Sequence, residues 1–214
     1  MHPDSRKTQE NFKFLKPFDR MKTDIILAGV GGQGILTIAA AIGFASLYEN
    51  KFVKQAEVHG MSQRGGAVQS HLRISDNPIA SDLIPLGNAD LILSVEPMEA
   101  LRYLPYLAKH GWVVTNSVPF VNIADYPSIT SIEQELRAFP NSIWINADQL
   151  AKDCRSPKSS NIVILGAASE HLGLSFDSLR AGIEQVFSRK GKDVVDANIR
   201  AFDVGTHNCV RSNV

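Results

Sequence analysis

Cysteine is scarce in this chain: among its 214 residues only Cys154 and Cys209 are cysteines. Neither has a second cysteine at the spacing that iron–sulfur clusters or structural zinc sites use, and their contexts do not suggest a disulfide scaffold. The sequence therefore excludes a protein that carries its own iron–sulfur clusters. Such sparse cysteine use suits a reducing compartment, and we expect the protein to be cytoplasmic.

An excess of one charge and long apolar runs are lacking as well. The chain has 22 Lys plus Arg and 22 Asp plus Glu, so its formal net charge is zero at pH 7. Without a basic surplus, we expect neither nucleic acid nor an anionic membrane as a partner. No apolar run approaches the ~20 residues of a membrane span, and the polar N-terminus lacks the apolar core of a signal peptide.

The length suits one large α/β domain with a sizeable core. Residues 1–20 are polar and charged without sustained periodicity, so we expect a flexible N-terminal extension there. We expect residues 21–214 to form a single domain, beginning at Met21.

A glycine cluster follows the first apolar run. Residues 25–28 are apolar and lead directly into the glycines, and residues 35–48 then have helical apolar spacing, which predicts strand, tight turn and helix. Glycines permit positive φ and close approach of a ligand, while free N–H groups at a helix start attract an anion. The turn is a candidate phosphate or carboxylate cradle, made of Gly29, Gly31, Gly32, Gln33 and Gly34. A purely architectural turn remains open, because tight packing of helix on strand requires the same glycines.

The glycine spacing also matches the dinucleotide-binding fingerprint. Glu57 lies roughly 20 positions after Gly34, near the place where an acidic residue holds the ribose in that fold. However, no helical pattern follows Glu57, whereas residues 67–74 alternate strictly and predict another strand. A nicotinamide-binding protein is therefore a weaker alternative.

A polar, glycine-rich loop joins the second and third predicted strands. Arg64 in this loop is suited to a phosphate, a carboxylate or an acidic partner surface. The candidate binding residues here are Glu57, His59, Ser62, Gln63, Arg64, Gly65 and Gly66. A solvated hairpin with an incidental arginine is the plain alternative. Glu57, His59 and His71 match no dense metal-ligand spacing, so we expect no metal site and a hydrogen-bonded His71.

The remaining chain alternates strand and helix patterns and ends in helices. This order predicts a three-layer α/β/α, Rossmann-like domain with a mostly parallel sheet and a helical C-terminal third. Ligands bind outside the carboxyl ends of the strands in such sheets, so we expect the glycine turn, residues 57–66, Glu96 and Asn116 to converge there. Glu96 could also cap the helix after it. The sequence assigns no residue to a chemical step. We predict strands at 51–58, 67–74, 90–95, 112–115 and 142–145, and later helices at 98–107, 132–139, 147–153, 161–172, 175–188 and 193–202. Pro105 should kink or shorten the first of these helices.

Two motifs carry a family resemblance: GVGGQG at residues 29–34 and the longer EVHGMSQRGG at residues 57–66. With them the chain resembles the gamma-type subunits or domains of 2-oxoacid:ferredoxin oxidoreductases, and the similarity runs from residue 21 to residue 205. It is most similar to the small beta subunits of the indolepyruvate-oxidising members, which share KQAEVHGMSQRGG at residues 54–66. The resemblance implies oxidative decarboxylation of an aryl 2-oxoacid to an acyl-CoA, with electrons passed to ferredoxin.

The resemblance also implies partners and cofactors. Thiamine diphosphate, Mg and 4Fe–4S clusters belong to a large alpha subunit, coenzyme A is a co-substrate, and this chain alone binds none of the cofactors. Alternatives remain open: a subunit for pyruvate or ketoisovalerate, a non-catalytic assembly subunit, or a stand-alone nicotinamide-binding protein. A homodimer of the isolated chain is also open.

Overall fold

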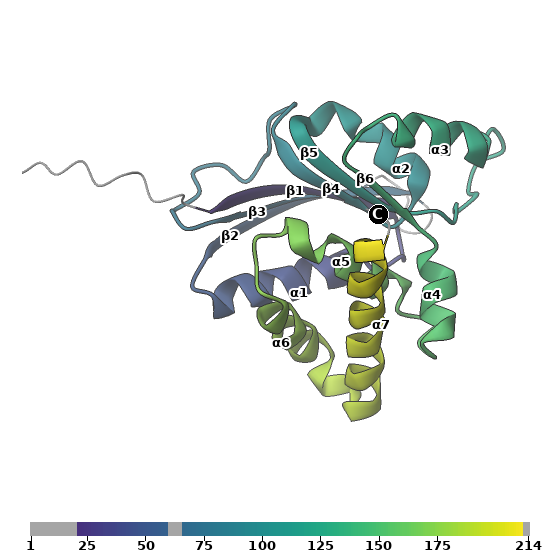
Figure 1. Cartoon of the computed structure of the whole chain (residues 1–214). Helices are drawn as coiled ribbons and strands as arrows, with labels where there is room; N and C mark the ends of the chain where they lie inside the picture. The colour runs from purple at the N-terminus through teal and green to yellow at the C-terminus, as the bar shows by residue number, and fades with distance from the viewer. Residues whose placement is uncertain (1–20, 60–65, 212–214) are drawn as a thin grey trace, which may run out of the picture.

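Six strands form one sheet in the computed structural model, which describes residues 21–59 and 66–211 (Figure 1). The predicted extension, residues 1–20, lies outside the described residues. The strand order is β2-β3-β1-β4-β5-β6. Neighbours from β1 to β6 pair in parallel, and β3 pairs antiparallel with both β1 and β2, which confirms the mostly parallel sheet. The strands are β1 (Lys22–Val30), β2 (Phe52–His59), β3 (Ala67–Ser75), β4 (Ala89–Ser94), β5 (Leu107–Asn116) and β6 (Ser142–Ile145).

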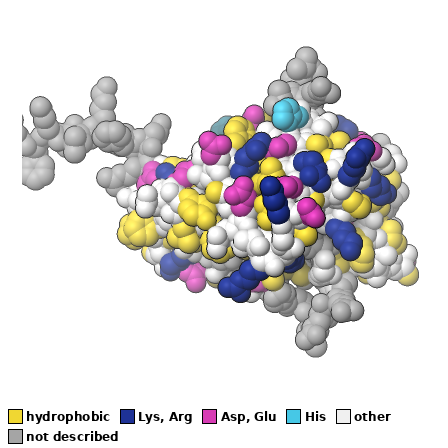
Figure 2. Space-filling view, turned by 90° about the horizontal axis from the view of Figure 1, so that it is seen from below, with side chains coloured by type: hydrophobic (Ala, Val, Ile, Leu, Met, Phe, Trp, Pro, Cys, Tyr) yellow, Lys and Arg dark blue, Asp and Glu magenta, His cyan; other side chains and the backbone are white. Residues whose placement is uncertain are grey.

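Helices cover both faces of the sheet and complete the predicted three layers. The smaller layer, above the sheet in Figure 1, contains α2 (Pro97–Arg102) and α3 (Ile129–Arg137). The larger layer, below it, contains α1 (Ile35–Tyr48), α4 (Ala147–Asp153), α5 (Ser160–Ala168), α6 (Phe176–Phe187) and α7 (Lys192–Arg211). Basic and acidic side chains are interspersed on the face seen in Figure 2, in line with the balanced composition. No helix in the described part of the chain is both long and apolar enough to cross a membrane.

The central strand β1 contributes side chains to both cores. Ile25 and Leu27 pack with the larger helix layer, while Ile26 packs with the smaller one, and all three are fully buried. A strand that is buried on both faces needs apolar residues at consecutive positions, which explains the continuous apolar run at residues 25–28. Its one fully buried charge, Asp24, receives hydrogen bonds from Arg73 on β3 through Nε at 2.8 Å and Nη2 at 3.0 Å. This paired contact offsets the cost of removing the Asp24 carboxylate from water.

Two expected element boundaries are wrong, while a third is changed as predicted. The helix expected at 98–107 is shortened by Pro105 and ends at Arg102, because Pro105 lies in a separate 3-10 turn, Leu104–Tyr106. Strand β5 then begins at Leu107 rather than at residue 112, since Leu107 already pairs with Ala89 of β4. The last helix continues to Arg211, well past residue 202. Two further 3-10 turns, Ser169–His171 and Ser188–Lys190, follow α5 and α6, whose bounds agree with the prediction to within a few residues.

Helix α7 continues past residue 202 because glycine allows it to lie against α5. A Cβ at Gly205 would collide with the Val163 carbonyl oxygen, and one at Gly166 would collide with the Phe202 carbonyl oxygen. These are backbone atoms of the facing helix and cannot rotate away. Glycine within a helix usually weakens it, so its presence here reflects the close approach of the two axes.

We predict that Gly205→Ala lowers the free energy of unfolding by at least about 1 kcal/mol, because the helices must separate. The melting temperature should fall by roughly 2–4 °C per kcal/mol in a chain of this size. Gly43→Ala in α1 is the matched control, since a Cβ at Gly43 meets no atom within 4 Å. It should be neutral or stabilising by up to ~1 kcal/mol. Equal effects of both changes in thermal melts would contradict this account of the α5–α7 contact.

Candidate functional site

The site lies where neighbouring strands end and the chain leaves for opposite faces of the sheet. Helix α1 follows β1 on the larger helix layer, whereas α2 follows β4 on the smaller one. The crevice between the carboxyl ends of β1 and β4 is therefore a topological switch point, the usual ligand position in such sheets. The Val95 N–H donates to the Ala28 carbonyl oxygen at 3.0 Å across this crevice. The glycine turn, Glu96 and Asn116 converge here, as the sequence predicts.

The turn after β1 depends on left-handed backbone at two positions. Gly32 has a φ of 100° and Gly34 a φ of 86°, values that residues with a Cβ rarely adopt. The side chain of Gln33 closes the turn, because its Oε1 accepts a hydrogen bond from the Val30 N–H at 2.8 Å. Gln33 thus stabilises the backbone conformation of the turn from within it.

The outer glycines of the motif have packing roles. A Cβ at Gly29 would collide with Val95 and lie 2.7 Å from Ile35 Cδ1, so this glycine brings β1 close to β4 and α1. A Cβ at Gly34 would lie 2.5 Å from Asn161 Nδ2, which itself donates to the Gly34 carbonyl oxygen at 3.1 Å. Gly29 therefore has a packing role, while Gly34 also connects the turn to α5.

The glycine turn is joined to the second motif. The Gly31 N–H donates to the Gly66 carbonyl oxygen at 2.9 Å, which fixes the start of β3 beside the turn. Ser62, Gln63, Arg64 and Gly65 lie outside the described residues. The backbone of His59 is part of β2, but its side chain is not described. Gly66, the last residue of the second motif, therefore lies beside the glycine turn.

Glu57 and His71 lie on opposite sides of the sheet. Glu57 pairs with Ser70 across β2 and β3, so the next residue, His71, faces the opposite side of the sheet. His71 Nδ1 accepts from the Ile84 N–H at 3.0 Å, and His71 Nε2 lies 2.8 Å from Gln69 Nε2. Burial lowers the pKa of His71, which keeps the ring neutral. The hydrogen-bonded role is confirmed for His71; among residues 21–59 and 66–211 no group of three His, Cys, Asp or Glu residues is placed to hold a metal.

The sheet order also separates Glu57 from the glycine turn. Strand β3 lies between β2 and β1, so Glu57 is two strands away from β1, roughly 10 Å at ordinary strand spacing. In the dinucleotide-binding fold the second strand is the direct neighbour of the first, and its acidic end can reach the ribose. The ribose-binding role of Glu57 does not fit this arrangement.

A cavity of about 650 Å³ opens beside the glycine turn. Lys158 before α5 and Lys190 before α7 line it, and Lys190 Nζ lies 5.3 Å from the centroid of the Phe187 ring. Its volume is in the range typical of ligand pockets, and two lysines beside helix starts favour an anion. The sequence alone did not point to these lysines, since they are more than 120 positions from the turn. The other lining residues are Gly32, Gln33, Gly34, Thr37, Ser156, Pro157, Ser159, Asn161, Asp193, Val194, Ala197 and Asn198.

A second cavity of about 230 Å³ lies on the other side of Gln33, at the carboxyl ends of β4 and β5. Asn116 organises its wall: Nδ2 donates to Asp148 Oδ2 at 3.0 Å, and Oδ1 accepts from the Ala147 N–H at 3.1 Å. The volume is below the usual range for a cofactor or substrate pocket. Asn116 thus holds the start of α4, and Gln33 is the residue that lines both cavities.

Glu96 borders the crevice where β4 leads into α2. It is fully buried, and its Oε2 accepts from the Glu99 N–H at 2.8 Å, which confirms the predicted cap of α2. Its Oε1 accepts from the Phe120 N–H at 3.2 Å and from the Tyr126 hydroxyl, two contacts without any local sequence signal. Burial, followed by the bond to Glu96, raises the pKa of Tyr126, so the phenol stays protonated as a donor. Glu96 therefore holds the loop between β5 and α3 in place.

Solved structures and curated relatives agree on the fold. A 2-oxoglutarate:ferredoxin oxidoreductase from Magnetococcus marinus matches with a TM-score of 0.70 over 89% of this chain and 31% of that one, at 22% identity, a level that shows the fold alone. Indolepyruvate oxidoreductase subunit IorB of Pyrococcus horikoshii is 38% identical over 85% of this chain and 93% of its own length. The subunit of the same name from Archaeoglobus fulgidus is 34% identical over 89% of this chain and 96% of its own.

The family comparison covers the whole site described above. The model for the pyruvate ferredoxin/flavodoxin oxidoreductase family matches residues 24–207, from the start of β1 to the last turns of α7. This match and the two curated relatives confirm the resemblance first carried by the two glycine motifs. The chain belongs to the pyruvate ferredoxin/flavodoxin oxidoreductase family.

Proposed function

We propose that this chain is the small subunit of an indolepyruvate oxidoreductase, which converts an aryl 2-oxoacid to an acyl-CoA and reduces ferredoxin. The observation that carries the proposal is the 38% identity to a subunit of that name over nearly its full length. More distant relatives, at 26% identity, are 2-oxoglutarate synthase subunits, so the sequence is nearer to the indolepyruvate group.

The redox cofactors of the complex belong, in this proposal, to a larger partner subunit. Two cysteines cannot supply the four thiolates of a 4Fe–4S cluster. The described residues likewise hold no group of three acidic, His or Cys ligands for the Mg of thiamine diphosphate. This chain would therefore bind and orient reactants, and none of its residues is assigned to the oxidation itself.

The cavity beside the glycine turn fits the phosphate-bearing part of coenzyme A. Lys158 and Lys190 can each contact a phosphate oxygen, and only Asp193 adds a negative charge to the lining. The first N–H groups of α1 have no intrahelical acceptor and point toward the turn, where they favour a bound anion. Arg64, in the loop that ends at Gly66, would add a paired contact to the ligand or to the partner subunit.

We predict that the purified chain is colourless and inactive with indolepyruvate. Activity should appear when the large subunit is added, because the clusters and thiamine diphosphate arrive with it. Ferredoxin reduction measured with indolepyruvate, pyruvate and 2-oxoglutarate in turn would also identify the substrate class. A brown, redox-active preparation of this chain alone would overturn the division of labour, and preference for pyruvate would overturn the substrate.

We predict that Gly32→Val weakens coenzyme A binding by the reconstituted complex at least about tenfold, since a side chain would enter the cavity and strain the turn. Gly87→Val is the matched control, because Gly87 also has a positive φ, 72°, with no atom within 4 Å of a Cβ. Both variants share the backbone strain, but Gly87 lies in the loop before β4, away from the cavity. Equal effects on the Michaelis constant for coenzyme A would show that the turn is only structural.

We predict that Arg64→Lys and Arg64→Ala both lower turnover or coenzyme A affinity of the complex by at least about tenfold. Loss of a charge-assisted contact costs roughly 1.5–3 kcal/mol, and a lysine cannot reproduce the paired geometry of a guanidinium. Arg137→Ala on α3 is the control, because Arg137 pairs with Glu133 on an exposed helix face and should matter little. Steady-state kinetics with coenzyme A and 2-oxoacid varied separately would decide it, and wild-type values for both Arg64 variants would leave the loop an ordinary hairpin.

A further inference from the structure

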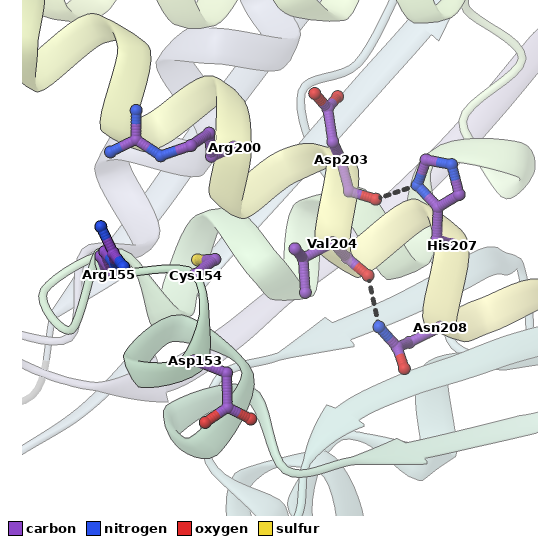
Figure 3. Close-up of a pocket in the computed structure, with 8 residues that line it drawn as sticks. All are labelled: Asp153, Cys154, Arg155, Arg200, Asp203, Val204, His207 and Asn208. Carbon is purple, nitrogen blue, oxygen red and sulfur yellow. Dashed lines mark hydrogen bonds between the residues drawn. The ribbon is translucent and has the colours of Figure 1, made fainter.

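A third cavity, of about 970 Å³, lies between the end of α4 and the C-terminal half of α7 (Figure 3). None of the residues of the glycine turn lines it. Figure 3 shows Arg155 and Arg200 toward one end of the group and His207 and Asn208 toward the other, with Cys154 and Val204 between them. Its volume is large enough for a small organic ligand. Asp153 and Asp203 complete the lining.

Arg155 occupies a position where glycine is normally found. Helix α4 ends in a Schellman motif, in which the Arg155 N–H donates to Lys152 and the Ser156 N–H donates to Ala151. The motif requires left-handed backbone, and Arg155 has a φ of 59°. A long side chain with a Cβ is disfavoured in this conformation, whereas glycine adopts it freely. Stability of the helix end therefore does not explain an arginine here, and Arg155 is one of the residues that line the cavity.

Helix α1 provides an internal comparison. It ends with the same hydrogen-bond pattern, from the Asn50 N–H to Leu47 and from the Lys51 N–H to Ser46. The left-handed residue there, Asn50 with a φ of 56°, is of a type that tolerates this conformation. Asn50 is thus a residue type that suits left-handed backbone, whereas Arg155, which lines the cavity, is not.

The charges around the cavity leave the two arginines available. Both carboxylates already have partners: Asp153 accepts from Gln149 Nε2 at 2.7 Å, and Asp203 accepts from Arg180 Nη2 at 2.5 Å. Among residues 21–59 and 66–211, neither Arg155 nor Arg200 has an ion-pair partner, and both are exposed. Their guanidinium groups can therefore receive a negative ligand without losing an existing bond.

We propose that this cavity binds an organic anion, whose carboxylate or phosphate group lies between the guanidinium groups of Arg155 and Arg200 while its apolar part contacts Cys154 and Val204. Guanidinium groups form paired hydrogen bonds with either kind of head group. The half-buried Cys154 and Val204 offer an apolar surface beside them. The inference concerns this chain alone and does not require the partner subunit.

Titration calorimetry of the full chain with phenylacetate, phenyl phosphate and inorganic phosphate tests the proposal. At least one aryl anion should bind saturably with a dissociation constant of about 1 mM or tighter, and the two aryl probes distinguish a carboxylate ligand from a phosphate ligand. Inorganic phosphate should bind more weakly, because it lacks the apolar part. No saturable binding of either aryl probe, or equally strong binding of inorganic phosphate, would overturn the proposal.

Two variants link binding to the arginines. Arg200→Gln and Arg155→Gly should each weaken the aryl probe at least about tenfold, while Asn50→Gly, the control at the other helix end, should bind normally. Arg155→Gly should also raise the melting temperature, by ~2–4 °C, because glycine relieves the left-handed residue. Unchanged binding in both arginine variants would contradict the site. A lower melting temperature in Arg155→Gly would show that the arginine serves stability rather than a ligand.

Discussion

Burial of β1 on both faces is the constraint on which the rest of the structure depends. A central strand between two helix layers must be apolar along most of its length, and its neighbours must satisfy every backbone group. Here β3 on one edge runs antiparallel and β4 on the other runs parallel. The chain that leaves β1 therefore enters a crevice whose two sides differ. On one side lies the hairpin of β2 and β3, and on the other lie the strand–helix units that contain Glu96 and Asn116.

The glycine motif combines two kinds of requirement in six residues. Gly29 is needed for close packing against Val95 and Ile35, whereas Gly32 is needed for backbone conformation and opens onto a cavity. Only the second kind leaves room for a ligand. A glycine spacing by itself does not separate the two, and this is why the same motif occurs in turns that bind nucleotides and in turns that only pack.

Local features of the fold and site were predictable from the sequence, and distant contacts were not. The strand–turn–helix at residues 25–48 and the hairpin of β2 and β3 follow from periodicities of 3.6 and 2 within short windows. The cap made by Glu96 follows from its place before Pro97. Its bond to Tyr126, the approach of Lys158 and Lys190 to the turn, and the extension of α7 past Gly205 depend on contacts between segments far apart in the chain. No local pattern encodes such contacts, because tertiary packing decides them.

The short segment from the last residue of α4 to the start of α5 contributes to two cavities. Residues 153–155 line the cavity with the two arginines, and residues 156–159 line the cavity beside the glycine turn. One short segment thus forms a wall of both. The segment is held by its own hydrogen bonds, because the Ser159 N–H donates to the Ser156 carbonyl oxygen at 2.9 Å and the two buried hydroxyls of these serines lie 2.7 Å apart. A substitution that displaces this backbone would therefore alter the walls of both cavities, although each cavity has its own set of lining residues.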